Sequence, residues 1–172
     1  MKKSARVAGG ALCLSCCLVV AGLVCALEQP GVRVENADSV GPRAVEMQTK
    51  AAVVRDYLAA WQSLKHALDG NNSGHLDADF TGIAREKLLG TIEDQRRLGL
   101  RTRYQNLRHD INLVFYSPEG LSIQLLDSVE YDVEVLDQDK LQATQHVRTQ
   151  YLAVLTPTEV KWKVRILQAV PR

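Results

Sequence analysis

The sequence predicts an α+β domain behind an N-terminal membrane or signal helix, with two or three helices packed on a curved, four-stranded antiparallel sheet. Three observations lead to this fold class. Residues 7–27 carry no charge. Apolar residues then recur at helical spacing up to about Leu98, and beyond about Arg103 they recur at every second position. Helices followed by an uninterrupted series of strands are typical of an α+β domain whose helices cover one face of the sheet.

The apolar run at residues 7–27 predicts export. It follows three basic residues within the first six positions, and a positive start of this kind precedes both secretory signals and membrane anchors. The run is long enough to cross a bilayer, which favours a single-pass inner-membrane anchor with a periplasmic or extracytoplasmic domain. The alternative is a signal peptide, because Val24-Cys25-Ala26 fits a peptidase site and cleavage after Ala26 releases a secreted protein.

Charge and cysteine content narrow the function classes. Three of the 21 Lys and Arg precede the apolar run and none of the 20 Asp and Glu do, so 18 basic residues face 20 acidic ones beyond it. A nucleic-acid-binding protein needs a dominant basic field, so we expect no nucleic-acid partner. All four cysteines lie within residues 7–27, which excludes a disulfide, a thiolate nucleophile or a zinc-thiolate site in the domain. We expect no cofactor.

Residues 28–43 are predicted to form a linker, because they contain two prolines and two glycines and show no periodicity. The folded domain is then expected to span residues 44–172. A long amphipathic helix is predicted from about residue 44 to residue 69. A second helical segment is predicted over 77–98, ended by Gly99, although two internal glycines make a division into two helices the alternative.

Four strands are predicted in the second half of the domain, at about 104–116, 121–135, 141–155 and 160–170. Short segments rich in Pro, Gly and Asp separate them, and such short connections make neighbouring strands antiparallel.

Two segments of the domain carry a resemblance to a known superfamily. Val53-Val54-Arg55-Asp56-Tyr57-Leu58-Ala59-Ala60-Trp61 and Val160-Lys161-Trp162-Lys163-Val164 resemble the opening helix and the closing strand of the nuclear-transport-factor-two-like superfamily, a cone of helices against a bent sheet. The match covers roughly residues 44–170. The membrane-tethered, non-enzymatic branches look most similar: inner-membrane subunits of type IV secretion, Mce-associated proteins, and the intermembrane-space domain of plastid and cyanobacterial division proteins. This resemblance implies an envelope protein as partner and transfers no functional residue.

A polar pair is predicted inside the sheet. His109 lies on the apolar face of the first strand, and Asp127 lies on the apolar face of the second. One register that keeps both faces inward sets the two residues directly opposite each other, within hydrogen-bonding reach. Gln145 and Thr149 of the third strand would line the same interior, and Tyr57 would enter it from the first helix.

A carboxylate that holds an imidazole in an apolar cavity is suited to general-base chemistry, because burial and pairing tune both pKa values. Some enzymes of the resembled superfamily use an interior Asp or His in this way. The alternatives are a satisfied buried pair without catalytic function, or a bulge that turns Asp127 to solvent.

The segment between the predicted helices resembles a calcium loop. Oxygen donors stand at its positions one, three, five and nine, which are Asp69, Asn71, Ser73 and Asp77. Position twelve is Phe80, where such a loop needs a bidentate glutamate. The alternative is an inter-helix turn built from residues that favour turns and caps.

Arginines cluster after the second helix and are candidates for an interaction surface that binds phospholipid headgroups or an acidic partner. They are Arg96, Arg97, Arg101, Arg103 and Arg108. The outward face of the second strand is acidic, with Glu130, Asp132 and Glu134. The alternatives are two solvated surfaces, or one docking surface with patches of both signs.

These observations favour an envelope-located, membrane-tethered interaction or scaffold domain without catalysis. The alternative is a small-molecule-binding or enzymatic cone that uses His109 and Asp127. A third interpretation is a secreted binder released by cleavage after Ala26.

Overall fold

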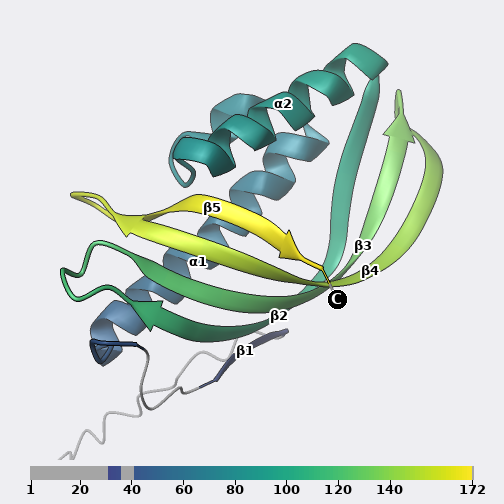
Figure 1. Cartoon of the computed structure of the whole chain (residues 1–172). Coiled ribbons are helices and arrows are strands. Elements are labelled where there is room, and N and C mark those ends of the chain that lie inside the picture. The colour runs from purple at the N-terminus through teal and green to yellow at the C-terminus, as the bar shows by residue number, and fades with distance from the viewer. Residues whose placement is uncertain (1–30, 36–40, 172) are drawn as a thin grey trace, which may run out of the picture.

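The computed structural model describes residues 31–35 and 41–171, and Figure 1 shows the arrangement of their helices and strands. The elements in chain order are β1 (Val32–Glu35), α1 (Met47–Asp69), the short 3₁₀ helix η1 (Ser73–Leu76), α2 (Gly82–Leu98), β2 (Leu100–Tyr116), β3 (Ile123–Asp137), β4 (Lys140–Pro157) and β5 (Trp162–Val170). The predicted α+β class is confirmed: the helices pack on one side of a strongly curved sheet (Figure 1).

The sheet has five strands in the order β1-β2-β3-β4-β5, rather than the four expected. The additional strand, β1, lies inside the segment predicted to be a linker, and it pairs parallel with β2, so the sheet is mixed. Its two valines are half-buried and pack against the core, while Arg33 between them is exposed. A four-residue alternation is too short to be distinguished from an irregular segment by its sequence pattern.

The helices follow the predicted pattern with shifted starts. The first begins at Met47, and its buried side includes Tyr57 and Trp61. The second begins only at Gly82, because residues 73–76 form a separate 3₁₀ turn and Phe80 bridges to Val164 of β5. It ends as predicted at Gly99, whose left-handed φ of 69° suits a residue without a side chain.

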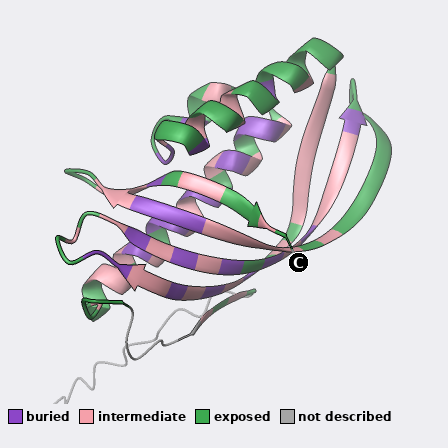
Figure 2. Cartoon of the chain, in the orientation of Figure 1, coloured by how far each residue is buried: buried purple, intermediate pink, exposed green. Residues whose placement is uncertain are grey.

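The sheet bends sharply because β2 contains a bulge between Gln105 and Arg108, where Asn106 adopts a positive φ of 55°. Beyond this bulge the first part of β2, the end of β3 and the start of β4 turn away from the rest of the sheet (Figure 1). Figure 2 shows that burial concentrates in the other part, where α1 crosses the concave face.

No described helix is both long and apolar enough to cross a bilayer. The segment at residues 7–27, for which an anchor or signal is predicted, lies outside the described residues.

Candidate functional site

The predicted polar pair is formed on the concave face of the sheet. His109 Nδ1 lies 2.8 Å from Asp127 Oδ2, and the same oxygen accepts a hydrogen bond from the Tyr57 hydroxyl at 2.9 Å. The predicted register, with His109 directly opposite Asp127, is shifted by two residues. In the structure the direct partner of Asp127 is Ile111 and that of His109 is Val129. The contact is therefore diagonal, which long side chains on the same face of a sheet can reach.

The pair is enclosed by aromatic rings. The Trp61 ring centroid lies 5.2 Å from that of His109, and Tyr57 lies at 6.4 Å from the same imidazole. The Asp127 side chain is fully buried and that of His109 is 4% exposed. An ionised carboxylate only accepts hydrogen bonds, so opposite such a carboxylate His109 Nδ1 is the donor of this contact.

Burial raises the pKa values of the tyrosines around this cluster. It raises the pKa of Tyr57 well above the ordinary value of 10, and the charge of Asp127 adds to the shift. Burial and the neighbouring Tyr151 raise the pKa of Tyr104 to about 12. Burial and a hydrogen bond to Tyr151 likewise raise the pKa of Tyr131, whose hydroxyl oxygen lies 3.1 Å from that of Tyr151. All of these groups are neutral near pH 7.

Two predicted interior residues do not join the pair. Gln145 lies on the part of β4 beyond the bend, opposite Val133, and it is exposed, so the prediction that it lines the interior is wrong. Thr149 lies opposite Val129 and is half-buried. Both residues belong to β4, whereas the cluster is formed by side chains of α1, β2 and β3.

The side chains of the predicted calcium loop do not converge. Asp69 accepts from Arg103 Nε at 3.2 Å, and Asp77 accepts from Arg85 at 2.8 Å. Asn71 donates to the Leu100 carbonyl at 2.7 Å, and Asn72 caps the turn by accepting from Gly74 N. Among the described residues, no group of three or more His, Cys, Asp or Glu side chains is arranged to hold a metal ion. The segment is a turn that ties α1 to β2 and α2.

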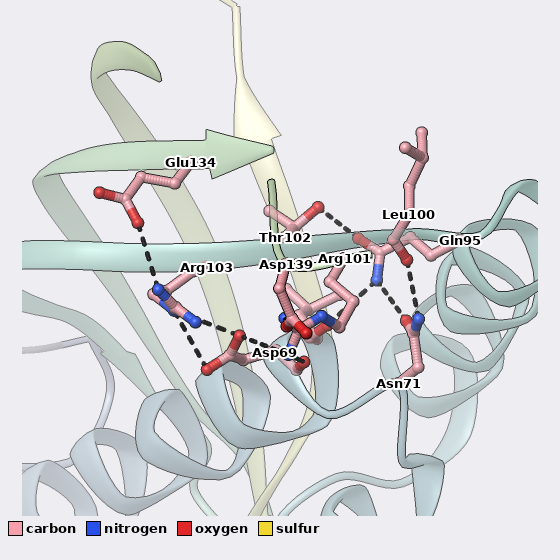
Figure 3. A network of polar contacts seen from close by, with 10 residues as sticks. Asp69, Asn71, Gln95, Leu100, Arg101, Thr102, Arg103, Glu134 and Asp139 are labelled. Carbon is pink, nitrogen blue, oxygen red and sulfur yellow. Dashed lines mark hydrogen bonds and ion pairs between the residues drawn. The ribbon is translucent and has the colours of Figure 1, made fainter. Parts of the chain in front are cut away.

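Two residues of the predicted arginine surface, Arg101 and Arg103, take part in this same network, which is drawn in Figure 3. Arg103 bridges Asp69 and Glu134, and Arg101 pairs with Asp139 and donates to the Asp69 carbonyl. Arg96 donates to the Asn71 carbonyl, and Arg97 pairs with Asp94 on its own helix. These four arginines therefore have intramolecular acceptors, which sequence proximity alone did not reveal.

Sequence reasoning missed a groove on the outer face of the sheet. The groove encloses about 580 Å³ beside β1 and crosses four strands. Its polar lining consists of Arg33, Arg108, His109, Asp110, Ser128, Glu130 and Arg148. The charges alternate, because Arg108 lies directly opposite Glu130 on β3, which in turn lies opposite Arg148 on β4. Arg148 donates to Glu130 at 2.8 Å and holds the pKa of that carboxyl below its usual range.

Two buried carboxylates on the helical side also escaped prediction, and both attach helices to β5. Asp56 accepts from the backbone N–H of Trp162 at 2.9 Å, and Asp79 accepts from Ser63 and Lys161. The sequence held one indication that Asp56 is buried: it stands next to Tyr57, on the side of α1 that faces the sheet.

Comparison with known proteins places the fold. A scan against protein-family models finds no match, and a search of curated proteins finds none either. Among solved structures, the intermembrane-space region of the chloroplast protein ARC6 superposes with a TM-score of 0.59 at 14% identity, covering 76% of this chain and all of that one. The chain has the cystatin-like cone fold. The predicted nuclear-transport-factor-two-like superfamily is thereby confirmed at the level of the fold.

Other cone proteins superpose less closely. A putative scytalone dehydratase from Novosphingobium aromaticivorans gives a TM-score of 0.46 at 16% identity, covering 73% of this chain and 89% of that one. A protein of unknown function with a cystatin-like fold from Nostoc punctiforme gives 0.39 at 12% identity, with coverages of 75% and 96%. A fold by itself does not assign a reaction.

Proposed function

We propose that this cone is an envelope-located, membrane-tethered interaction domain that has no catalytic function and binds a protein partner in the outer groove. The observation that carries the proposal is the groove itself, with its alternating charges along Arg108, Glu130 and Arg148. Alternating charges across neighbouring strands fit an extended segment with charges of both signs, and such complementarity selects a partner and fixes its register.

The concave interior supports this choice because its polar groups are already in contact with one another. Asp127 Oδ2 is shared by His109 and Tyr57, and the imidazole lies against Trp61. A substrate that needs His109 Nε2 would have to displace packed aromatic side chains, which costs free energy that the outer groove does not demand.

The tether rests on the apolar run at residues 7–27 and its basic start. An anchor there would hold the cone within a short linker of the membrane, so that an envelope protein is the partner class most often encountered.

Site-specific photocrosslinking in intact cells tests the proposal. A photoreactive residue at Ser128, which lies in the groove and is exposed, should give one discrete protein adduct. Arg108→Glu should abolish that adduct by reversing a groove charge, while Asp127→Asn should leave it in place. The matched control is a photoreactive residue at Thr91, exposed on α2, which should give none. Adducts at Thr91 but not at Ser128 would overturn the groove as the binding site.

A second candidate is the small-molecule-binding or enzymatic cone. It is favoured by one observation: Asp127 Oδ1 is buried and has no hydrogen-bond partner among the described residues. Such a group is unusual in a purely structural pair. Native mass spectrometry of the purified chain after exposure to a metabolite extract decides between the candidates. A bound small molecule that is lost in Asp127→Asn and His109→Ala would favour this second function.

A further inference from the structure

The strand β4 has an unpaired edge. It runs from Lys140 to Pro157, but its pairing with β5 begins only at Gln150, which lies opposite Val170. The chain then reaches Pro171, which has no backbone N–H to continue the ladder. Residues 140–149 therefore pair with β3 on one side and with no described strand on the other.

This edge is accessible. In Figure 1 the segment is the outermost strand of the part of the sheet that lies beyond the bend. Residues 140–146 are all exposed, as Figure 2 shows, and Leu141 has 52% of its surface exposed. Every second residue of such an edge directs an N–H and a C=O outward, where another strand can pair with them.

The edge also lacks the features that usually prevent pairing. Residues 141–147 read Leu-Gln-Ala-Thr-Gln-His-Val and contain no Lys, Arg, Asp, Glu or Pro. Natural edge strands are commonly protected by charged side chains, proline or bulges. The β3–β4 ladder shifts register at Gln142, because Val135 pairs with Ala143 and Leu136 pairs with Leu141, and it is regular from Ala143 to Leu155.

We infer that this edge pairs with the same edge of a second copy of the chain, antiparallel about a two-fold axis that passes through Gln145. The two-fold keeps each face of the sheet continuous, because residues an equal distance from Gln145 share a face. This register pairs Ala143 with Val147 and Thr144 with His146, and it lies within the part of β4 that pairs regularly with β3. Two opposed Gln145 side chains can exchange amide hydrogen bonds.

Charge selects this register over its neighbours. A two-fold through Thr144 would place Lys140 opposite Arg148 twice, and like charges opposite each other destabilise a sheet. A two-fold through His146 would require Gln150, whose free side is already occupied by Val170. In the proposed register the ladder ends at Val147, before Gln150 pairs with Val170 at the end of β5.

Charge substitution at Gln145 tests the pairing in the full-length chain. The mass of the chain in detergent micelles is measured by light scattering, and the wild type should be a dimer. Gln145→Lys and Gln145→Glu should each weaken the dimer about tenfold or more, because two like charges then meet at the axis. An equimolar mixture of the two variants should restore the dimer, which also shows that both variants fold.

Two further measurements identify the edge. Gln168→Lys, an exposed substitution on β5, is the matched control and should leave the dimer intact. Backbone amides of residues 141–149 should exchange more slowly as protein concentration rises. A wild type that is monomeric at about 1 mM would overturn the inference. So would a dimer unaffected by either Gln145 variant, or exchange protection at 141–149 that does not depend on concentration.

Discussion

Removing the Tyr57 hydroxyl should destabilise the fold, because that hydroxyl donates to a fully buried carboxylate. Tyr57 and Asp127 are both without solvent exposure, and their oxygens lie 2.9 Å apart. A hydrogen bond to a charged group contributes about 1.5–3 kcal/mol. Removal also relieves the desolvation of one hydroxyl, so we expect Tyr57→Phe to lower the free energy of unfolding by about 2 kcal/mol.

The expected change is large enough to measure by thermal unfolding. A domain of roughly 130 residues unfolds with an entropy of about 0.27 kcal/mol per kelvin, so a loss of about 2 kcal/mol lowers the Tm by about 7 °C. Tyr116→Phe is the matched control. Tyr116 is also buried, but its hydroxyl donates to no described residue, so its loss should cost less than about 0.5 kcal/mol.

A double-mutant cycle with Asp127→Asn separates the pair from its surroundings. The two substitutions should show a coupling energy of about 1–2 kcal/mol in urea unfolding followed by circular dichroism, because they share one hydrogen bond. If Tyr57→Phe had no larger effect than Tyr116→Phe, the structural role of the cluster would be refuted. A gain in stability would point to strain held for function and would favour the enzymatic alternative.

Further predictions concern two glycines of the second helix and its end, the buried tyrosines, and calcium. Gly90→Ala should stabilise α2 by about 0.5–1 kcal/mol, since a side chain there meets no atom within 4 Å. Gly99→Ala should lower the free energy of unfolding by about 1 kcal/mol, although a side chain there also meets no atom within 4 Å, because the φ of Gly99 is 69°. Urea midpoints of the two variants measure both effects. The free energy of unfolding should be at its full value below pH 10 and should decrease above it. Tyrosines of the unfolded chain ionise there, while Tyr57 and Tyr104 stay neutral in the folded chain. Each of the two tyrosines should lower the free energy of unfolding by about 1.4 kcal/mol per pH unit, and urea midpoints recorded up to about pH 11 measure this decrease. Millimolar calcium should not raise the Tm, since Arg103 already occupies Asp69.

The elements of the domain could be predicted because their periodicity is long and regular. Val164 on β5 is buried, as its alternation with lysines indicates, and Trp61 lies on the predicted buried side of α1. The proximity of His109 and Asp127 was also predictable, because both occupy the apolar face of neighbouring strands.

The register of these strands was not predictable, because it depends on irregularities without a local signal. Asn106 adopts a positive φ inside a run that reads as ordinary strand, and the bulge beside it shifts the faces of β2. The acceptors of Arg103 and Arg101 come from residues more than thirty positions away, so only the tertiary structure reveals them.

The bend of the sheet explains why the interior and the edge of this cone serve different purposes. The bulge at Asn106 bends this end of the sheet towards α1, where Arg101 and Arg103 of β2 contact Asp69. Gln145 lies at the same end on β4, its side chain is exposed, and its backbone has no described partner strand on one side. β5 cannot cover the free side, because it is 9 residues long against 18 for β4 and is followed by Pro171. Because residues 141–147 of this edge contain no Lys, Arg, Asp, Glu or Pro, the edge is costly to leave exposed, and pairing about Gln145 covers it without moving any residue of the core.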